Sequence, residues 1–155
     1  MNLYFLRHAD AQAQEPGMAD ADRELTLKGH EQAQRAAEWL RKRKVRVALV
    51  LSSPLLRAVQ TAEPVAMALG AEIEEDPRLS GGKLTPRSLR ALLADYHDPE
   101  SVLLVGHEPD FSTLITELTV EPVEMRKAAL ALVQGPEIAE DEMELIWVVP
   151  SKLQD

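Results

Sequence analysis

The chain has 155 residues, of which 45% are hydrophobic and 28% are charged, a balance typical of a folded globular protein. It contains no cysteine, which excludes disulfides, thiolate nucleophiles and cysteine-ligated metal sites. Its formal net charge of -9 argues against non-specific nucleic-acid binding, because proteins that bind in this way carry a positive surface that displaces phosphate counterions.

A chain of this length is expected to bury one core, so residues 1–155 are predicted to form a single domain. No apolar run approaches the roughly 20 residues of a membrane-spanning helix. The apolar segment before Arg7 is too short for a secretory signal and has no basic residues in front of it. We therefore expect a cytoplasmic protein that does not bind membranes.

The first half of the chain alternates between strand and helix patterns. The apolar run 3–6 predicts a buried strand, and after a polar loop apolar residues recur at helical spacing, with Thr26 as the expected N-cap. The inward-facing positions of this helix are Leu27, Ala33, Ala36, Ala37 and Leu40. Residues 45–51 predict a second strand, and Pro54 suits the first turn of a helix that ends at Gly70.

The second half continues the alternation. A brief strand is expected at 72–74, and a helix at 88–96 follows a loop rich in glycine, serine and proline. Residues 101–105 form the clearest buried strand pattern, and a helix is expected from about 110 to 118. Two further strands are expected at residues 128–133 and 144–149, separated by the acidic stretch 137–144.

Strands that alternate with helices imply a mainly parallel sheet covered on both faces, with right-handed crossovers. The expected fold is therefore α/β, a three-layer α/β/α sandwich, with an antiparallel contribution near the C-terminal hairpin. Ligands of such sheets bind beyond the carboxyl ends of the strands, which is where chemistry is expected.

Basic and polar side chains follow three of the predicted strands. Arg7 and His8 follow the first, Ser52-Ser53 follow the second with Arg57 one helical turn later, and His107 follows the strand at 101–105. Two arginines and two histidines could therefore meet in one pocket. Guanidinium groups bind phosphate oxygens in pairs, and a neutral imidazole can attack phosphorus, so the pattern indicates phosphoryl transfer.

A metal site is another use for histidines, and its ligands would be His8, His30, His97 and His107. These residues lack the close helical spacing of a typical zinc site. His30 and His97 also fall in segments predicted to be surface helix. We expect no metal and no other cofactor.

Four segments carry a resemblance to a known family, namely Leu6-Arg7-His8-Ala9 and residues 25–33, 52–62 and 105–109. In order and in content they resemble the histidine phosphatase superfamily, also called phosphoglycerate-mutase-like. The segments span about two thirds of the chain. The resemblance implies a metal-independent phosphatase with the phosphoglycerate-mutase-like fold.

The resemblance also implies a role for each strand-end residue. His8 would be the nucleophile that accepts the phosphoryl group, Arg7 and Arg57 would bind phosphate, and His107 would contact the transferring group. The family signature has glycine where this chain has Ala9, so the added methyl group either fits the backbone or reshapes the pocket wall.

Within the superfamily, the short length and the start of the sequence at residues 7–11 are most similar to SixA-type phosphohistidine phosphatases. Phosphoglycerate mutases and acid phosphatases are larger and carry insertions that roof the pocket. An open pocket would admit a phosphorylated histidine of a phosphotransfer or signalling protein, and equally a small phosphorylated metabolite. A mutase is disfavoured, because it must keep its phosphoryl group away from water.

An ester substrate would need a general acid to protonate its leaving group, whereas phosphohistidine relaxes that need. The candidate acids in the sequence are Asp10, Glu75, Asp76 and Glu108. Two other functions stay open: a small-molecule phosphomonoesterase of the same superfamily, and a non-catalytic phosphate-binding module.

Overall fold

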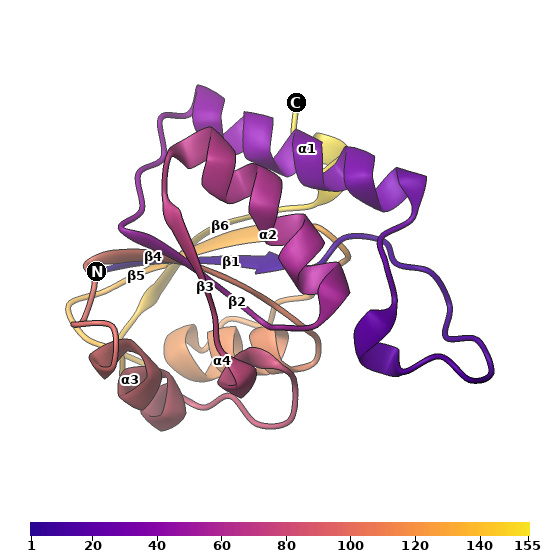
Figure 1. Cartoon of the computed structure of the whole chain (residues 1–155). Helices are drawn as coiled ribbons and strands as arrows, with labels where there is room; N and C mark the ends of the chain where they lie inside the picture. The colour runs from indigo at the N-terminus through magenta and orange to yellow at the C-terminus, as the bar shows by residue number, and fades with distance from the viewer.

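Six strands form the central sheet of the computed structural model, which describes residues 1–155 (Figure 1). The strands are β1 Asn2–Arg7, β2 Leu49–Ser52, β3 Glu72–Glu75, β4 Ser101–Gly106, β5 Leu130–Gln134 and β6 Glu144–Val149. Their order across the sheet is β3-β2-β4-β1-β5-β6. The first four are parallel, whereas β5 and β6 run antiparallel at one edge.

Helices cover both faces of this sheet (Figure 1). The helices α1 Leu27–Lys42 and α2 Leu56–Leu69 lie on one face, and α3 Pro86–Ala94 and α4 Asp110–Thr119 lie on the other. Single turns of 3-10 helix occur at η1 Asp20–Asp22, η2 Pro77–Leu79 and η3 Ser151–Leu153. The predicted three-layer α/β/α sandwich with a mainly parallel sheet is confirmed. None of the helices has both the length and the apolar character needed to cross a membrane.

The uninterrupted apolar sequence of β1 follows from burial on both of its faces. Leu3 and Phe5 belong to the core under α3 and α4, whereas Tyr4 and Leu6 belong to the core under α1 and α2. Successive side chains of a strand point to opposite faces, so a strand between two helical layers needs apolar residues at every position. The ring of Phe5 packs edge-on against Phe111 of α4, with centroids 5.1 Å apart.

The start of α1 is packed tightly against the loop that follows β1. Thr26 caps the helix as predicted, because its Oγ1 accepts a hydrogen bond from the Gly29 N–H at 3.0 Å. A Cβ atom on Gly29 would lie 2.0 Å from the carbonyl oxygen of Asp10. Only glycine lets the helix approach the loop this closely.

The expectation that Leu27 faces inward is wrong, since this residue is 78% exposed. Leu27 precedes Gly29 by two residues, which places it about 200° around the helix axis from the position that touches the loop. The inward face of α1 instead begins at Gly29 and continues through residues 33, 36, 37 and 40.

Several element boundaries also differ from the sequence prediction. The helix expected at 88–96 spans Pro86–Ala94, and the strand expected at 128–133 spans Leu130–Gln134. The strand expected at 45–51 begins only at Leu49, where pairing with both neighbouring strands begins. The helix expected from Pro54 begins at Leu56, because the Ser53 hydroxyl accepts a hydrogen bond from the Leu55 N–H and holds the chain in a turn. For β2 and the start of α2, strand pairing and turn contacts thus set a later boundary than the apolar pattern alone predicts.

Candidate active site

The carboxyl ends of three adjacent strands bring the two predicted histidines together. In the order β2-β4-β1, strand β4 lies between the other two. The His8 N–H donates to the Gly106 carbonyl at 3.0 Å, and the Ser53 N–H donates to the Val105 carbonyl at 2.9 Å, so the ladder continues just past the strand ends. The imidazole rings of His8 and His107 consequently lie 5.2 Å apart between centroids.

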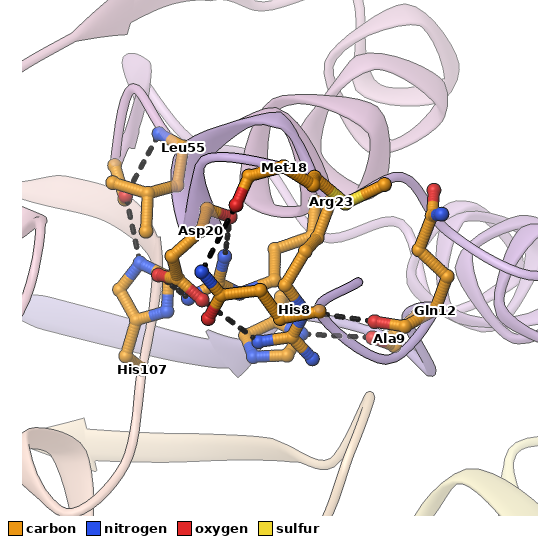
Figure 2. Close-up of polar contacts among 11 residues, drawn as sticks. His8, Ala9, Gln12, Met18, Asp20, Arg23, Leu55 and His107 are labelled. Atoms are coloured by element: carbon orange, nitrogen blue, oxygen red, sulfur yellow. Dashed lines mark hydrogen bonds and ion pairs between the residues drawn. The ribbon is translucent and has the colours of Figure 1, made fainter. Parts of the chain in front are cut away.

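His8 is buried and oriented by its own neighbour. Its Nδ1 lies 2.8 Å from the carbonyl oxygen of Ala9, which can only accept, so Nδ1 carries the proton and Nε2 holds the lone pair (Figure 2). Burial lowers the pKa of His8 to about 3, and the neighbouring His107 ring and the charges of Arg57 and Arg7 lower it further. The ring is therefore neutral near pH 7 and presents a free nucleophilic nitrogen.

His107 is held by a different group. Its Nε2 lies 2.7 Å from the Ser53 hydroxyl, which also accepts a hydrogen bond from the Leu55 N–H at 3.2 Å (Figure 2). Burial lowers the pKa of His107 to about 4, and the positive charge of Arg57 lowers it further. A neutral imidazole in a fixed orientation can donate one hydrogen bond to a phosphate oxygen without repelling the two arginines.

Both predicted arginines have side chains with unused hydrogen-bond donors. The Arg57 guanidinium donates from Nη1 to the Asp20 carbonyl at 2.9 Å and from Nη2 to the Asp20 carboxylate at 3.1 Å. Arg7 donates from Nη1 to the Met125 carbonyl at 3.1 Å. The Nε groups of Arg7 and Arg57 are buried and have no partner. Buried donors are normally satisfied, so two unpaired guanidinium N–H groups beside two neutral histidines indicate a site for an anion.

Asp20 was not identified from the sequence. It lies on η1, in the long loop after β1, and its carboxylate contacts Arg57 at 3.1 Å and Arg23 at 3.0 Å (Figure 2). Arg23 is itself held in place by donating from Nε to the Gln12 carbonyl at 2.7 Å. The carboxylate thus binds the arginine that is predicted to hold phosphate. Its contact with Arg57 joins residues 37 positions apart, and no local pattern indicates it.

Thr61 is a second residue that the sequence analysis missed. Its hydroxyl accepts a hydrogen bond from the Ala9 N–H at 3.0 Å and donates to the Arg57 carbonyl at 2.7 Å, tying the loop after β1 to α2. Its place one helical turn after Arg57 is the only signal that could have pointed to it. The methyl group of Ala9 fits this backbone: it is fully buried in a small cluster with Leu25, Ala33 and Ala128 and has no left-handed φ angle.

The four candidate acids do not gather in the same way. Asp10 accepts from the Thr26 hydroxyl at 2.7 Å and pairs with Lys127 at 3.0 Å, contacts that hold its pKa below the usual range. Glu108 accepts from both the backbone N–H and the hydroxyl of Ser112. Each of these two carboxylates is already engaged by another group.

The other two candidates lie at the outer strand β3, which β2 and β4 separate from β1. Asp76 pairs with Arg78 at 2.7 Å, and the hydrogen bonds from this arginine are the main cause that lowers the pKa of Asp76 to about 2. Glu75 is exposed. The structure therefore brings Arg7, His8, Arg57 and His107 together beyond the carboxyl ends of β1, β2 and β4. Each candidate acid is instead engaged by another group or lies at the outer strand.

The remaining histidines lie apart from this pocket and from each other. His30 is exposed on α1 and His97 is exposed after α3, and these helices cover opposite faces of the sheet. The structure contains no group of three or more His, Asp or Glu residues arranged to hold a metal ion.

Residues 3–84 match the sequence profile of the histidine phosphatase superfamily (branch 1). The chain belongs to the histidine phosphatase superfamily. The resemblance to this superfamily is thus confirmed, and with it hydrolase activity through a phosphohistidine intermediate, which is general in this superfamily. The strand-end histidine and the buried arginine donors described above are consistent with that chemistry.

Two relatives and one solved structure show the similarity in more detail. The phosphohistidine phosphatase SixA of Escherichia coli K12 is 33% identical over 126 residues, which cover 76% of this chain and 74% of that protein. An uncharacterized protein of Picosynechococcus sp. PCC 7002 is 40% identical over 116 residues, 71% of this chain and 68% of the relative. The structure of the protein histidine phosphatase SixA complexed with tungstate superposes with a TM-score of 0.78 at 29% identity and covers 98% of each chain.

Proposed function

We propose that this enzyme is a cytoplasmic phosphohistidine phosphatase, with residues 1–155 acting as one domain and His8 as the nucleophile. Its substrate would be a phosphorylated histidine on a phosphotransfer or signalling protein. The observation that carries the proposal is the pocket itself: a neutral, oriented His8 beside His107, with unpaired guanidinium donors on both arginines. Three of the candidate acids, Asp10, Asp76 and Glu108, are engaged by other groups. The likeness to SixA proteins supports it.

In the proposed reaction, the Arg7 and Arg57 guanidinium groups hold the equatorial oxygens of the phosphoryl group while His8 Nε2 attacks phosphorus in line. A bond forms from phosphorus to Nε2, and the bond from phosphorus to the substrate nitrogen breaks with its electron pair staying on the substrate, whose second ring nitrogen carries a proton, so that the leaving group is a neutral imidazole. Water then attacks the phosphohistidine and releases one proton to solvent, the bond from phosphorus to Nε2 breaks with its electron pair returning to Nε2, and inorganic phosphate leaves. His107 donates a hydrogen bond to the charge that builds up in both steps.

The environment of the candidate acids favours phosphohistidine over an ester. An alkoxide leaving group needs a proton in the transition state, and a carboxyl group can supply it only when protonated. Asp10 and Asp76 have lowered pKa values and are ionised near pH 7. Imidazole leaves more readily than an alkoxide, so a pocket without a poised acid is suited to a phosphoramidate bond.

The test compares kcat/KM for a histidine-phosphorylated phosphotransfer protein with values for a panel of sugar and nucleoside phosphates. We expect the protein to be preferred by at least two orders of magnitude. A preference for the panel would replace the proposal with a small-molecule phosphomonoesterase. Stoichiometric binding without phosphate release would instead identify a non-catalytic module.

A trapping experiment tests the nucleophile separately. Rapid acid-free quenching with radiolabelled substrate should leave label on His8 in the wild type and none in His8→Ala. The variant His30→Ala, which removes an exposed histidine of α1, is the matched control and should be labelled like the wild type. Full turnover by His8→Ala would remove His8 from the mechanism.

A further inference from the structure

A large polar groove opens beside the phosphate pocket. It has a volume of about 1090 Å³ and is lined by 12 residues, none of them hydrophobic. Three separated parts of the chain form it: the first half of α1, the segment 124–127 before β5, and residues 150–152 after β6. Arg7 also lines it, so the groove begins at a residue of the phosphate pocket.

The groove is net positive, whereas the protein as a whole is net negative. The chain carries 17 lysines and arginines against 26 aspartates and glutamates, whereas the groove has six basic residues and three acidic ones. The basic residues are Arg7, Lys28, Arg35, Arg126, Lys127 and Lys152. A cluster of this kind on an acidic protein creates a local positive potential that attracts anionic groups from solution.

Besides Arg7 of the phosphate pocket, three of the six basic groove residues have no carboxylate partner within the molecule. Two of the groove's three acidic residues are paired, Asp10 with Lys127 at 3.0 Å and Glu124 with Arg126 at 3.7 Å. Lys28, Arg35 and Lys152 are exposed and have no carboxylate within ion-pair distance. These three side chains come from α1 and η3, two elements that pack together. They are therefore free to pair with carboxylates of another molecule.

We propose that this groove is the docking surface for an acidic face of the phosphorylated protein substrate, which thereby brings its phosphohistidine to His8. The inference rests on the proposed function and extends it from the reacting group to the partner's surface. A single phosphoryl group is already accommodated by Arg7 and Arg57, so three additional free cations spread over two elements fit a larger anionic surface than one small metabolite offers.

The predominance of charged and polar residues in the lining indicates the type of complex. Stable interfaces have an apolar centre, whereas contacts made by exposed charges are weak, sensitive to salt and fast to form. An enzyme that must release its dephosphorylated partner after each turnover needs contacts of that type. The groove thus favours rapid, electrostatically steered encounters with an acidic partner.

The test uses a double charge reversal in the groove, Arg35→Glu with Lys152→Glu, neither of which is placed in the catalytic pocket. The matched control is Lys44→Glu with Arg46→Glu, two exposed basic residues beyond the end of α1 that also lack ion pairs. Both double variants change the net charge equally. Two substrates are compared: a histidine-phosphorylated phosphotransfer protein with acidic residues beside its histidine, and an aryl phosphate.

With the phosphoprotein at low ionic strength, the groove variant should lose about tenfold or more in kcat/KM, and the loss should shrink as salt is added. With the aryl phosphate it should stay within about twofold of the wild type. The control variant should stay within about twofold on both substrates. When the acidic residues of the phosphoprotein are replaced by their amides, the wild type and the groove variant should become equal.

Other outcomes separate the two proposals. If the wild type hydrolyses the phosphoprotein but the groove variant does so equally well, the groove proposal is overturned and the proposed function stands. If the wild type hydrolyses no phosphohistidine protein, both are overturned. Inhibition of phosphoprotein turnover by transfer RNA or by phosphatidylserine vesicles, without inhibition by polyglutamate of equal charge, would assign the groove to a different class of partner.

Discussion

His8 and His107 lie with their ring centroids 5.2 Å apart and their planes tilted by 54°, and each ring is anchored by a group that the other does not use. The Ala9 carbonyl orients His8, whereas the Ser53 hydroxyl holds His107. Burial keeps the pKa of both rings well below 6.5, so the two neutral imidazoles can lie next to two arginines without charge repulsion.

The anchor of His107 can be removed without touching the ring. In Ser53→Ala the hydrogen bond at 2.7 Å is lost, and we expect kcat for an aryl phosphate to fall about tenfold, with little change in KM, because the ring is needed mainly as charge develops. Ser101→Ala removes a serine hydroxyl that contacts the Arg46 carbonyl and is the control. Unchanged kcat in Ser53→Ala would show that His107 needs no anchor.

The lowered pKa values predict how stability depends on pH. In the unfolded chain both histidines have a pKa near 6.5, but in the folded protein the values are about 3 for His8 and about 4 for His107. Between these limits the unfolded state binds more protons, so the free energy of unfolding is highest above pH 6.5 and falls as the pH drops towards 4. Urea unfolding at pH 7 and pH 5 measures the loss.

A histidine variant provides the comparison for this effect. His107→Gln cannot take up a proton on unfolding, so it should lose less stability between pH 7 and pH 5 than the wild type does. His97→Gln, which removes an exposed histidine, should behave like the wild type. The carboxylates with lowered pKa, Asp10, Asp20 and Asp76, titrate below this window and do not interfere. If all three proteins lost the same unfolding free energy between pH 7 and pH 5, the lowered pKa of His107 would be contradicted.

If Arg57 binds phosphate as proposed, Asp20 and the phosphate must compete for the same guanidinium. The Asp20 carboxylate contacts Arg57 Nη2 at 3.1 Å, so an anion that uses this nitrogen must displace it. Asp20→Asn weakens the contact by removing its charge, and vanadate inhibition should become about fivefold tighter. Asp22→Asn, an exposed change on η1 outside this ion pair, should leave the inhibition constant unchanged. Weaker inhibition in Asp20→Asn would mean that the carboxylate orients Arg57 for the anion.

Thr61 is predicted to stabilise the loop after β1. Thr61→Val keeps the side-chain shape but leaves the buried Ala9 N–H without its acceptor, which should cost about 1–3 kcal/mol of unfolding free energy. Thr116→Val removes an exposed hydroxyl that contacts the Glu121 carbonyl and should cost less than half as much. Chemical denaturation of the two variants measures the difference. Equal losses of unfolding free energy in the two variants would show that the buried hydrogen bond stabilises the protein no more than the exposed one.

The sequence was sufficient for the order of the strands and for finding the basic side chains that gather at the strand ends, because both depend on local signals. Uninterrupted apolar runs identified β1 and β4, and the polar residues directly after them pointed to His8 and His107. Arg57 could be predicted because it follows the end of its strand by one helical turn. The strand expected at 45–51 was too long, since a strand begins where a neighbour offers hydrogen bonds, and here that point is Leu49.

Features that depend on distant contacts could not be predicted in this way. Asp20 reaches Arg57 across 37 positions, and neither residue type nor spacing indicates that contact. The groove has the same origin, because Lys28 and Lys152 become neighbours only when η3 packs on α1. The net negative charge of the sequence even argued against a basic surface of this kind. Net charge describes the whole chain, whereas recognition depends on where individual charges lie.

Gly29 makes the active site depend on a residue that contributes no functional group. Any side chain there would collide with the Asp10 carbonyl and push the start of α1 away from the loop that follows His8. Random mutagenesis followed by a screen for lost phosphatase activity should therefore recover substitutions at Gly29 beside those at the histidines and arginines. In a sequence alignment of this enzyme's close relatives, a glycine at this position would mark the same helix-to-loop packing.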